Sequence, residues 1–229
     1  MPFCRYFLNV RGGSVSLANV LKTQKIDLTA STISRLEWLA AELLHWNRRH
    51  NLTAITGQDA VYEKHLVDSL TLLPYLQGGS FLLDLGSGAG FPGLPLKIAS
   101  PFLRVVAVDA VAKKIRFQSH VVRTLKIEGY RAVHGRAESL ATQHDYKGKY
   151  DLVTARALTS LVNLAKLAKP FLTEGGRLLA MKGPEAEQEL KSCRHELYEQ
   201  GWTINCYGLT LELSKARRCL VEMRCSGEG

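Results

Sequence analysis

Residues 81–93 combine an apolar run, a carboxylate and closely spaced glycines, a pattern that can bind a small molecule against bare backbone. The sequence is Phe-Leu-Leu-Asp-Leu-Gly-Ser-Gly-Ala-Gly-Phe-Pro-Gly. A Cβ at Gly86 or Gly88 would block both the turn and the approach of a ligand. A second apolar run, residues 104–109, ends in Asp109, at the distance where an acid binds a ribose diol in nucleotide-binding folds. These residues therefore predict a nucleoside site.

Two nucleoside ligands fit this pattern: S-adenosyl-L-methionine and a nicotinamide dinucleotide. The order Asp-x-Gly-x-Gly-x-Gly is typical of methyltransferases that use S-adenosyl-L-methionine, but Gly88-x-Gly90-x-x-Gly93 also satisfies the dinucleotide pattern. Dinucleotide-binding strands rarely carry an acid such as Asp84 before the turn. Pro92 also lacks an N–H where a pyrophosphate would need one. These features favour the methyl donor, and a glycine turn without a ligand is the third interpretation.

The composition fits one α/β domain with an appendage. The chain has 229 residues, of which 46% are hydrophobic, and no apolar run reaches the ~20 residues of a membrane span. The N-terminus lacks the apolar length and cleavage site of a signal peptide. The five cysteines contain no CxxC pair and indicate neither a zinc site nor a disulfide framework. We expect a cytoplasmic protein with no metal ion and no membrane association.

The formal net charge of +9 favours a polyanionic partner. Lysines and arginines gather in four clusters: Arg48-Arg49, Lys113-Lys114-Arg116, Arg123 with Lys126, and Lys215-Arg217-Arg218. A basic enzyme without such a partner is the alternative. The clustering of these charges favours a nucleic acid as the partner.

The chain changes character near Gly78-Gly79. We predict an N-terminal helical extension over residues 1–78 and a core over residues 79–229. In the core, strands are predicted over 81–85, 104–109, 130–134, 150–155, 175–181, 202–209 and 218–224. Helices are predicted over 93–100, 112–127, 160–170 and 184–200. Repeated βα units and a final hairpin predict the Rossmann-like, seven-stranded α/β fold of class I S-adenosylmethionine-dependent methyltransferases, with ligands at the carboxyl ends of the strands.

The N-terminal extension has its own helical patterns. An apolar stripe runs from Ile33 to Trp46 at spacings of three and four residues. Asp59 is the expected N-cap of a second helix, which continues to Pro74. Trp38 and Trp46 are expected to belong to the core rather than to stack on bases.

Charged residues also fall at the predicted ligand edge of the sheet. Arg136-Ala137-Glu138 follows the third strand, where an adenine would lie, and Arg156 follows the fourth. A surface position could explain Glu138 or Arg156 alone. Their shared place at strand ends favours a functional role.

With these motifs the chain resembles the glucose-inhibited division protein B family, bacterial methyltransferases that modify N7 of a guanine in 16S ribosomal RNA. The resemblance extends from about Leu36 to Met223 and rests on six segments that are specific in combination: 46–55, 65–70, 83–96, 136–138, 154–157 and 180–183. It implies S-adenosyl-L-methionine as donor and S-adenosyl-L-homocysteine as product. It also implies 16S ribosomal RNA or a small-subunit particle as substrate. We expect the enzyme to be a monomer.

In that family, donor contacts fall on positions that match Gly86, Phe91, Ala137, Glu138 and Arg156, to which our own analysis adds Gly88 and Asp109. The chain departs from the family twice. Ala110 stands where a serine often follows the acid, and residues 1–16 have no counterpart that we can place.

The motifs that the chain lacks point to the same acceptor. It has neither a Pro-Pro loop for exocyclic amines nor a Pro-Cys nucleophile for carbon-5. Guanine N7 has a lone pair and no proton, so alignment suffices and no general base is expected. Arg136 and Arg156, with Arg218 as a third candidate, would position the guanine or its phosphates. Glu138 or another nearby carboxylate would stabilise the cationic product.

Other interpretations stay open. A methyltransferase of this fold could act on a small molecule or a protein, and a non-catalytic RNA-binding module could keep the fold. His50, Asn51, His65 and Asp68 either contact the donor pocket or cap and pack helices. In the second case Asn51 and Thr53 cap turns, and His65 pairs with Asp68 three residues later.

Overall fold

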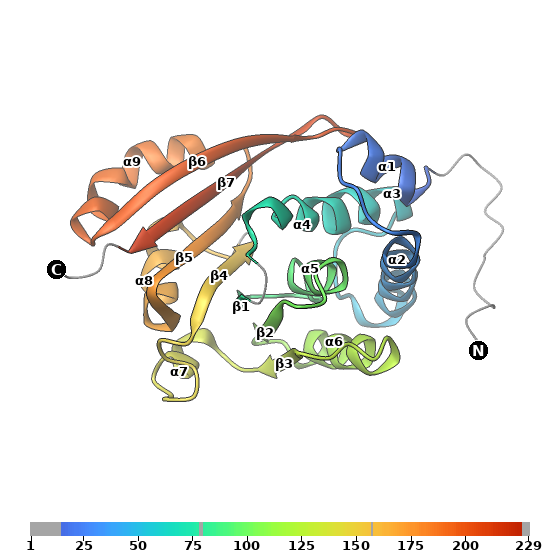
Figure 1. The fold of residues 1–229 in the computed structure, drawn as a ribbon, viewed down its shortest axis with the longest axis horizontal. Coiled ribbons are helices and arrows are strands. Elements are labelled where there is room, and N and C mark those ends of the chain that lie inside the picture. Colours follow the sequence, from blue (N-terminus) through green and yellow to red (C-terminus); the bar gives the residue numbers. More distant parts are fainter. Residues whose placement is uncertain (1–14, 78–79, 157, 226–229) are drawn as a thin grey trace.

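Within the part of the chain that the structure describes, a seven-stranded sheet forms the middle layer and helices cover both of its faces (Figure 1). This computed structural model describes residues 15–77, 80–156 and 158–225. The strand order is β3-β2-β1-β4-β5-β7-β6. The strands are β1 (Phe81–Leu85), β2 (Arg104–Asp109), β3 (Tyr130–His134), β4 (Tyr150–Arg156), β5 (Leu172–Lys182), β6 (Trp202–Leu211) and β7 (Ala216–Cys225).

Neighbours within the part of the sheet with order β3-β2-β1-β4-β5 pair in parallel. Strand β7 runs antiparallel to both of its neighbours, β5 and β6. Parallel neighbours need a long crossover, which helices supply here, whereas a short turn is enough between β6 and β7. The carboxyl ends of β1, β2 and β4 therefore meet at one edge. This arrangement confirms the predicted Rossmann-like α/β fold.

The helices divide into an N-terminal group and a core group. The N-terminal group comprises α1 (Leu17–Thr23), α2 (Ala30–His50), α3 (Gln58–Val61), a π-helix (Tyr62–Val67), α4 (Asp68–Leu70) and a 3-10 turn (Leu73–Tyr75). The core group comprises α5 (Gly93–Ala99), α6 (Ala112–Thr124), α7 (Ala137–Ala141), α8 (Leu161–Ala168), a 3-10 turn (Lys169–Phe171) and α9 (Ala186–Glu199).

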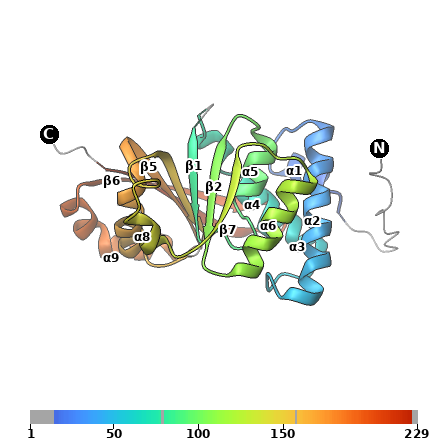
Figure 2. The same cartoon turned by 90° about the horizontal axis from the view of Figure 1, so that it is seen from below.

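Each face of the sheet has its own apolar core, because successive strand residues point to opposite sides. Leu82 and Val105 belong to the cluster formed with α5, α6 and the N-terminal helices. Leu83 and Val106 belong to the cluster formed with α7, α8 and α9. Figure 2 shows the sheet with α8 and α9 on one side and α5, α6 and the N-terminal helices on the other. The N-terminal helices are thus part of the layer that covers one face of the sheet.

Helix α2 has the predicted apolar stripe. Leu36, Leu39 and Leu43 are fully buried. Trp38 and Trp46 pack against the same cluster, and the Trp46 ring centroid lies 5.5 Å from that of Phe117 on α6. Both tryptophans are therefore packing residues, as predicted.

Several local predictions differ from the structure. The N-cap before α3 is Gly57 rather than Asp59, which lies in the first turn. The continuous helix expected up to Pro74 is broken into α-, π- and 3-10 segments. Helices α1 and α7 were not predicted, because five to seven residues give too short a periodic pattern. The predicted boundary at 78–79 lies outside the described residues. So do residues 1–14, which belong to the segment without a counterpart in the family.

Cys206 on β6 and Cys219 on β7 form a disulfide, a pair that the sequence analysis did not predict. Their separation of 13 residues contains no recognisable motif, and the two become neighbours only through strand pairing. No helix in the described ranges is long and apolar enough to cross a membrane.

Candidate active site

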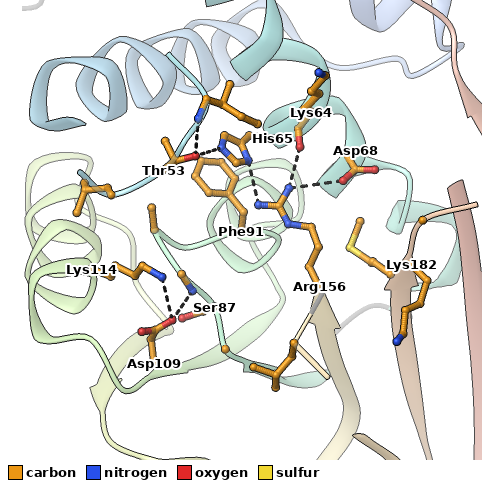
Figure 3. A pocket seen from close by; sticks show the side chains of 18 of the residues that line it. Thr53, Lys64, His65, Asp68, Ser87, Phe91, Asp109, Lys114, Arg156 and Lys182 are labelled. Carbon is orange, nitrogen blue, oxygen red and sulfur yellow. Dashed lines mark hydrogen bonds and ion pairs between the residues drawn. The ribbon is translucent and has the colours of Figure 1, made fainter. Parts of the chain in front are cut away.

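A cavity of about 610 Å³ opens at the carboxyl ends of the strands, between the sheet and the N-terminal helices (Figure 3). It is large enough for a nucleoside ligand. The candidate residues that line it include Gly86, Gly88, Phe91, Asp109, Arg156, Arg218, His65 and Asp68. The chain therefore brings the glycine loop and two of the candidate arginines to one cavity.

The glycine loop is held in a conformation that favours glycine. Gly86 and Gly88 have φ angles of 65° and 58°. A Cβ added to Gly88 would meet nothing within 4 Å, so it would enter open cavity space. At Gly93, in contrast, a Cβ would lie 2.8 Å from Asp84 Oδ2. The loop thus presents bare backbone on the cavity side and packs tightly on the other side.

Asp84 anchors this loop from below. Its Oδ2 accepts a hydrogen bond of 2.9 Å from the Gly93 N–H, and the side chain is fully buried. Among the described residues, its Oδ1 has no hydrogen-bond partner. Burial raises the pKa of Asp84 to about 7, against the opposing effects of the Gly93 N–H and of Arg156. Asp84 does not line the cavity, so its role in the structure is to hold the loop.

Asp109 fastens the same loop to β2. Its Oδ2 accepts a hydrogen bond of 2.8 Å from Gly88 N–H, and its Oδ1 accepts one of 2.8 Å from Val111 N–H. Lys114 Nζ lies 4.0 Å from Oδ2. Each carboxylate oxygen has two lone pairs, so both retain capacity for a ribose hydroxyl. The carboxylate is therefore oriented by backbone before any ligand binds.

Arg156 reaches from the end of β4 to the N-terminal helices on the far side of the cavity (Figure 3). Its Nη1 donates to the Lys64 carbonyl at 2.7 Å and lies 3.5 Å from Asp68 Oδ2, and its Nη2 donates to His65 Nδ1 at 2.9 Å. The guanidinium carbon also lies 5.7 Å from the centroid of the Phe91 ring. Arg156 thus joins the core to the N-terminal extension at the site.

His65 is held neutral in this network. Burial, followed by the charge of Arg156, lowers the pKa of His65 to about 3. Since Nδ1 accepts from Arg156, the ring proton resides on Nε2, which lies 3.0 Å from Thr53 Oγ1. The ring stacks on Phe91 with centroids 4.6 Å apart and planes 18° apart. His65 therefore orients both the arginine and the phenylalanine.

Asp68 lies between two arginines rather than beside His65. Its Oδ1 accepts from Arg218 Nε at 3.3 Å, and its Oδ2 faces Arg156. The carboxylate is 4% exposed, and burial raises its pKa although both arginines oppose that shift. The predicted pairing of His65 with Asp68 is wrong, because each finds a stronger partner about ninety residues or more away in the chain. The His-x-x-Asp spacing did place both on one helical face.

The segment after β3 lies beside the cavity without lining it. Arg136 is the N-cap residue of α7, and the side chains of Arg136 and Glu138 are exposed. Gly135 N–H donates a hydrogen bond of 3.1 Å to the Asp109 carbonyl, which keeps this segment next to Asp109. The structure thus does not bring Arg136, Ala137 and Glu138 to the cavity wall.

Of the remaining candidate residues near the site, Thr53 lines the cavity, whereas His50 and Asn51 do not. Asn51 is the C-cap of α2 with a left-handed φ of 46°. Thr53 Oγ1 accepts a hydrogen bond of 3.1 Å from Ile55 N–H, as a turn-capping residue would. His50 is exposed next to Trp46. Lys182, at the end of β5, also lines the cavity, and its Nζ lies 2.9 Å from Glu189, which does not line it.

Comparison with known proteins agrees with this geometry. The family model for rRNA small subunit methyltransferase G matches residues 32–206. The ribosomal RNA small subunit methyltransferase G of Syntrophotalea carbinolica is 46% identical over 209 residues, covering 91% of this chain and 96% of that protein. Its counterpart from Leuconostoc citreum is 42% identical over 191 residues, covering 82% and 80% of the two chains.

Solved structures share the fold at low sequence identity. A SAM-dependent methyltransferase from Aquifex aeolicus superposes with a TM-score of 0.54 at 18% identity, covering 72% of this chain and 92% of its own. The family match includes the glycine loop, Asp109 and Arg156. The chain therefore belongs to the rRNA small subunit methyltransferase G family.

Proposed function

We propose that this protein transfers a methyl group from S-adenosyl-L-methionine to N7 of a guanine in 16S ribosomal RNA. The observation that carries the proposal is the cavity in which the Gly86–Phe91 loop and Asp109 face Arg156 and its network. One wall suits a nucleoside, and the other offers guanidinium groups. Membership of the family supplies the substrate class.

The residues of the cavity fit the methyl donor. The open space at Gly88 is a cradle that a Cβ would fill, and Asp109 is oriented to accept from ribose hydroxyls. We assign donor binding to Gly86, Gly88, Phe91, Asp109 and Arg156. Ala137 and Glu138 stay in the proposed site at its adenine end, because Gly135 N–H ties their segment to the Asp109 carbonyl.

Arg156 is also the proposed positioning group for the guanine. A guanidinium has five N–H groups. Three are used by Lys64, His65 and Asp68, which leaves two for substrate among the described contacts. These two are the Nε N–H and the second Nη2 N–H, which can donate to acceptors such as guanine O6 and N7. Arg136 and Arg218 remain proposed partners of the guanine or its flanking phosphates.

The chemistry asks little of the protein beyond alignment. Bound S-adenosyl-L-methionine would supply an electrophilic methyl group on a sulfonium. The chain's own residues hold the donor loop, orient Arg156 and exclude water. No side chain has to remove a proton, since N7 carries none. The buried carboxylate of Asp68 offsets part of the positive charge of Arg156 and Arg218, so the cationic product base meets less repulsion than the two arginines alone would cause.

We further propose that the enzyme works as a monomer in the cytoplasm, on 16S ribosomal RNA or a small-subunit particle and without membrane association. Ribosomal RNA as substrate supports the location. We also keep the division into a helical extension over residues 1–78 and a core over residues 79–229 as a proposal.

A labelled-methyl assay tests the function. Purified protein with S-adenosyl-L-methionine carrying a labelled methyl group should label 16S ribosomal RNA or small-subunit particles. It should not label 23S ribosomal RNA, cellular protein or the small-molecule fraction. Label in protein or small molecules alone would overturn the proposal in favour of another acceptor class. Donor binding without any transfer to RNA would also contradict it.

A further inference from the structure

The β6–β7 hairpin reaches back over the N-terminal helices, as Figure 1 shows. Leu211, at the end of β6, is fully buried in the same apolar cluster as Leu17 and Leu21 of α1. The tip of a strand pair from the end of the chain is therefore packed on the beginning of the chain.

Gln24, the C-cap residue of α1, fixes this tip through its side-chain amide. Its Nε2 donates to the Thr210 carbonyl at 2.9 Å, and its Oε1 accepts from Glu212 N–H at 3.0 Å. The amide thus bonds the hairpin backbone as a neighbouring strand would. Two bonds in opposite directions define the position of the tip more closely than a single contact does.

Two carboxylates of the adjoining helices hold the same hairpin. Glu63, which is 2% exposed, accepts a hydrogen bond of 2.7 Å from Ser214 N–H. Asp68 accepts from Arg218 Nε on β7. Gln24 and Glu63 thus hold the tip of the hairpin, and Asp68 holds Arg218, which lies farther from the tip and lines the cavity.

The strand register connects Gln24 to Arg218. Thr210 is paired with Arg217, and Leu209 is paired with Arg218. Thr210 is therefore one register position away from the pair that contains Arg218, the β7 residue that lines the cavity. Arg218 uses Nε for Asp68 and one Nη1 proton for the Arg217 carbonyl. Of its five N–H groups, three have no acceptor among the described contacts and are available to RNA.

We propose that Gln24 is a positioning residue for the RNA substrate, which it affects by setting where Arg218 presents its guanidinium at the cavity. This proposal rests on the proposed function. Gln24 touches neither the donor loop nor the cavity wall, so its influence should be on RNA and not on the methyl donor.

The test is a double-mutant cycle of Gln24→Ala and Arg218→Ala, measured as methyl transfer to 16S ribosomal RNA. Gln24→Ala should raise the KM for RNA about fivefold, the equivalent of one hydrogen bond, with kcat and donor affinity nearly unchanged. In the Arg218→Ala background the same change should add almost nothing, because its effect passes through that arginine. Thr23→Ala is the matched control, since Thr23 bonds to the Asn19 carbonyl within α1.

Hydrogen exchange provides a second readout that does not depend on activity. The Glu212 amide should exchange faster in Gln24→Ala than in wild type or Thr23→Ala, which shows directly that the contact has been lost. Equal increases in KM with and without Arg218 would overturn the proposal, as would an unchanged KM in a variant whose Glu212 amide exchanges faster. A wild-type enzyme that does not methylate 16S ribosomal RNA would refute the proposed function instead.

Discussion

Replacing Arg156 by alanine tests whether this residue aligns the bound guanine, which affects the rate at saturating RNA, or only helps to bind the RNA, which affects affinity. The change removes the bonds to the Lys64 carbonyl and to His65 Nδ1 and the ion pair with Asp68. Because Arg218 still faces Asp68, we expect a loss of about 3 kcal/mol in the free energy of unfolding, the lower end for a broken buried pair. The saturated rate of methyl transfer should fall roughly 100-fold, the cost of a misplacement of about 1 Å.

The comparison variant removes charge from α6 outside the cavity. Lys113→Gln with Arg116→Gln leaves Lys114, which lines the cavity, in place. This double variant should weaken RNA binding and reduce the salt slope of log affinity by roughly one for each residue, with a normal rate at saturating RNA. Urea unfolding, RNA titrations at two salt concentrations and single-turnover transfer give the three quantities. If Arg156→Ala loses only RNA affinity and keeps the saturated rate, our placement of the guanine is wrong.

Three further predictions concern the donor loop and the buried histidine. Gly88→Val should abolish S-adenosyl-L-methionine binding in a folded protein, because its side chain would occupy open cavity space, and normal affinity by calorimetry would contradict that. Asp109→Ala should weaken donor binding by about 1–3 kcal/mol, and an unchanged dissociation constant would move the ribose contact elsewhere. Neutral His65, whose pKa is lowered to about 3, stabilises the fold above its ordinary pKa of 6.5 and loses that contribution as pH falls. The advantage of wild type over His65→Asn in urea unfolding should therefore shrink by up to ~1.4 kcal/mol per pH unit below about pH 6.5, and a constant difference would refute a neutral buried ring.

Asp84 also makes the stability of the protein depend on pH, because its pKa is raised whereas that of His65 is lowered. Its pKa is raised to about 7, so the folded state binds a proton that the unfolded state releases between 3.8 and 7. Its contribution is lost as pH rises through that window. The two slopes oppose one another in wild type, so the variant comparison isolates His65.

The strand-loop motifs could be predicted from sequence because their causes are local. Glycines with positive φ, an acid at the end of β2 and alternating strand residues follow from neighbours in the chain. The pairing of Arg156 with His65 could not be predicted, since the two lie 91 residues apart and meet only when the N-terminal helices pack on the sheet. The sequence could not decide between a surface position and a cavity position for Glu138, because the five residues of α7 give too short a periodic pattern.

The N-terminal helices are the part of the site that local patterns described least well. Periodicity predicted the buried face of α2, but it did not predict the π-helix Tyr62–Val67. That segment supplies Lys64, His65 and, just beyond it, Asp68 to the cavity. π-Helices are rare and are frequently found at functional sites. Tertiary packing rather than propensity determines this part of the site.

Mapping of methylated bases tests the central claim most directly. 16S ribosomal RNA should be isolated from cells with this protein, without it, and with the Arg156→Ala variant in its place. We predict one N7-methylated guanine that is present with the wild-type protein, absent without it, and present in a smaller fraction of the RNA with the Arg156→Ala variant. A methylation pattern of 16S ribosomal RNA that is identical in all three would contradict the account.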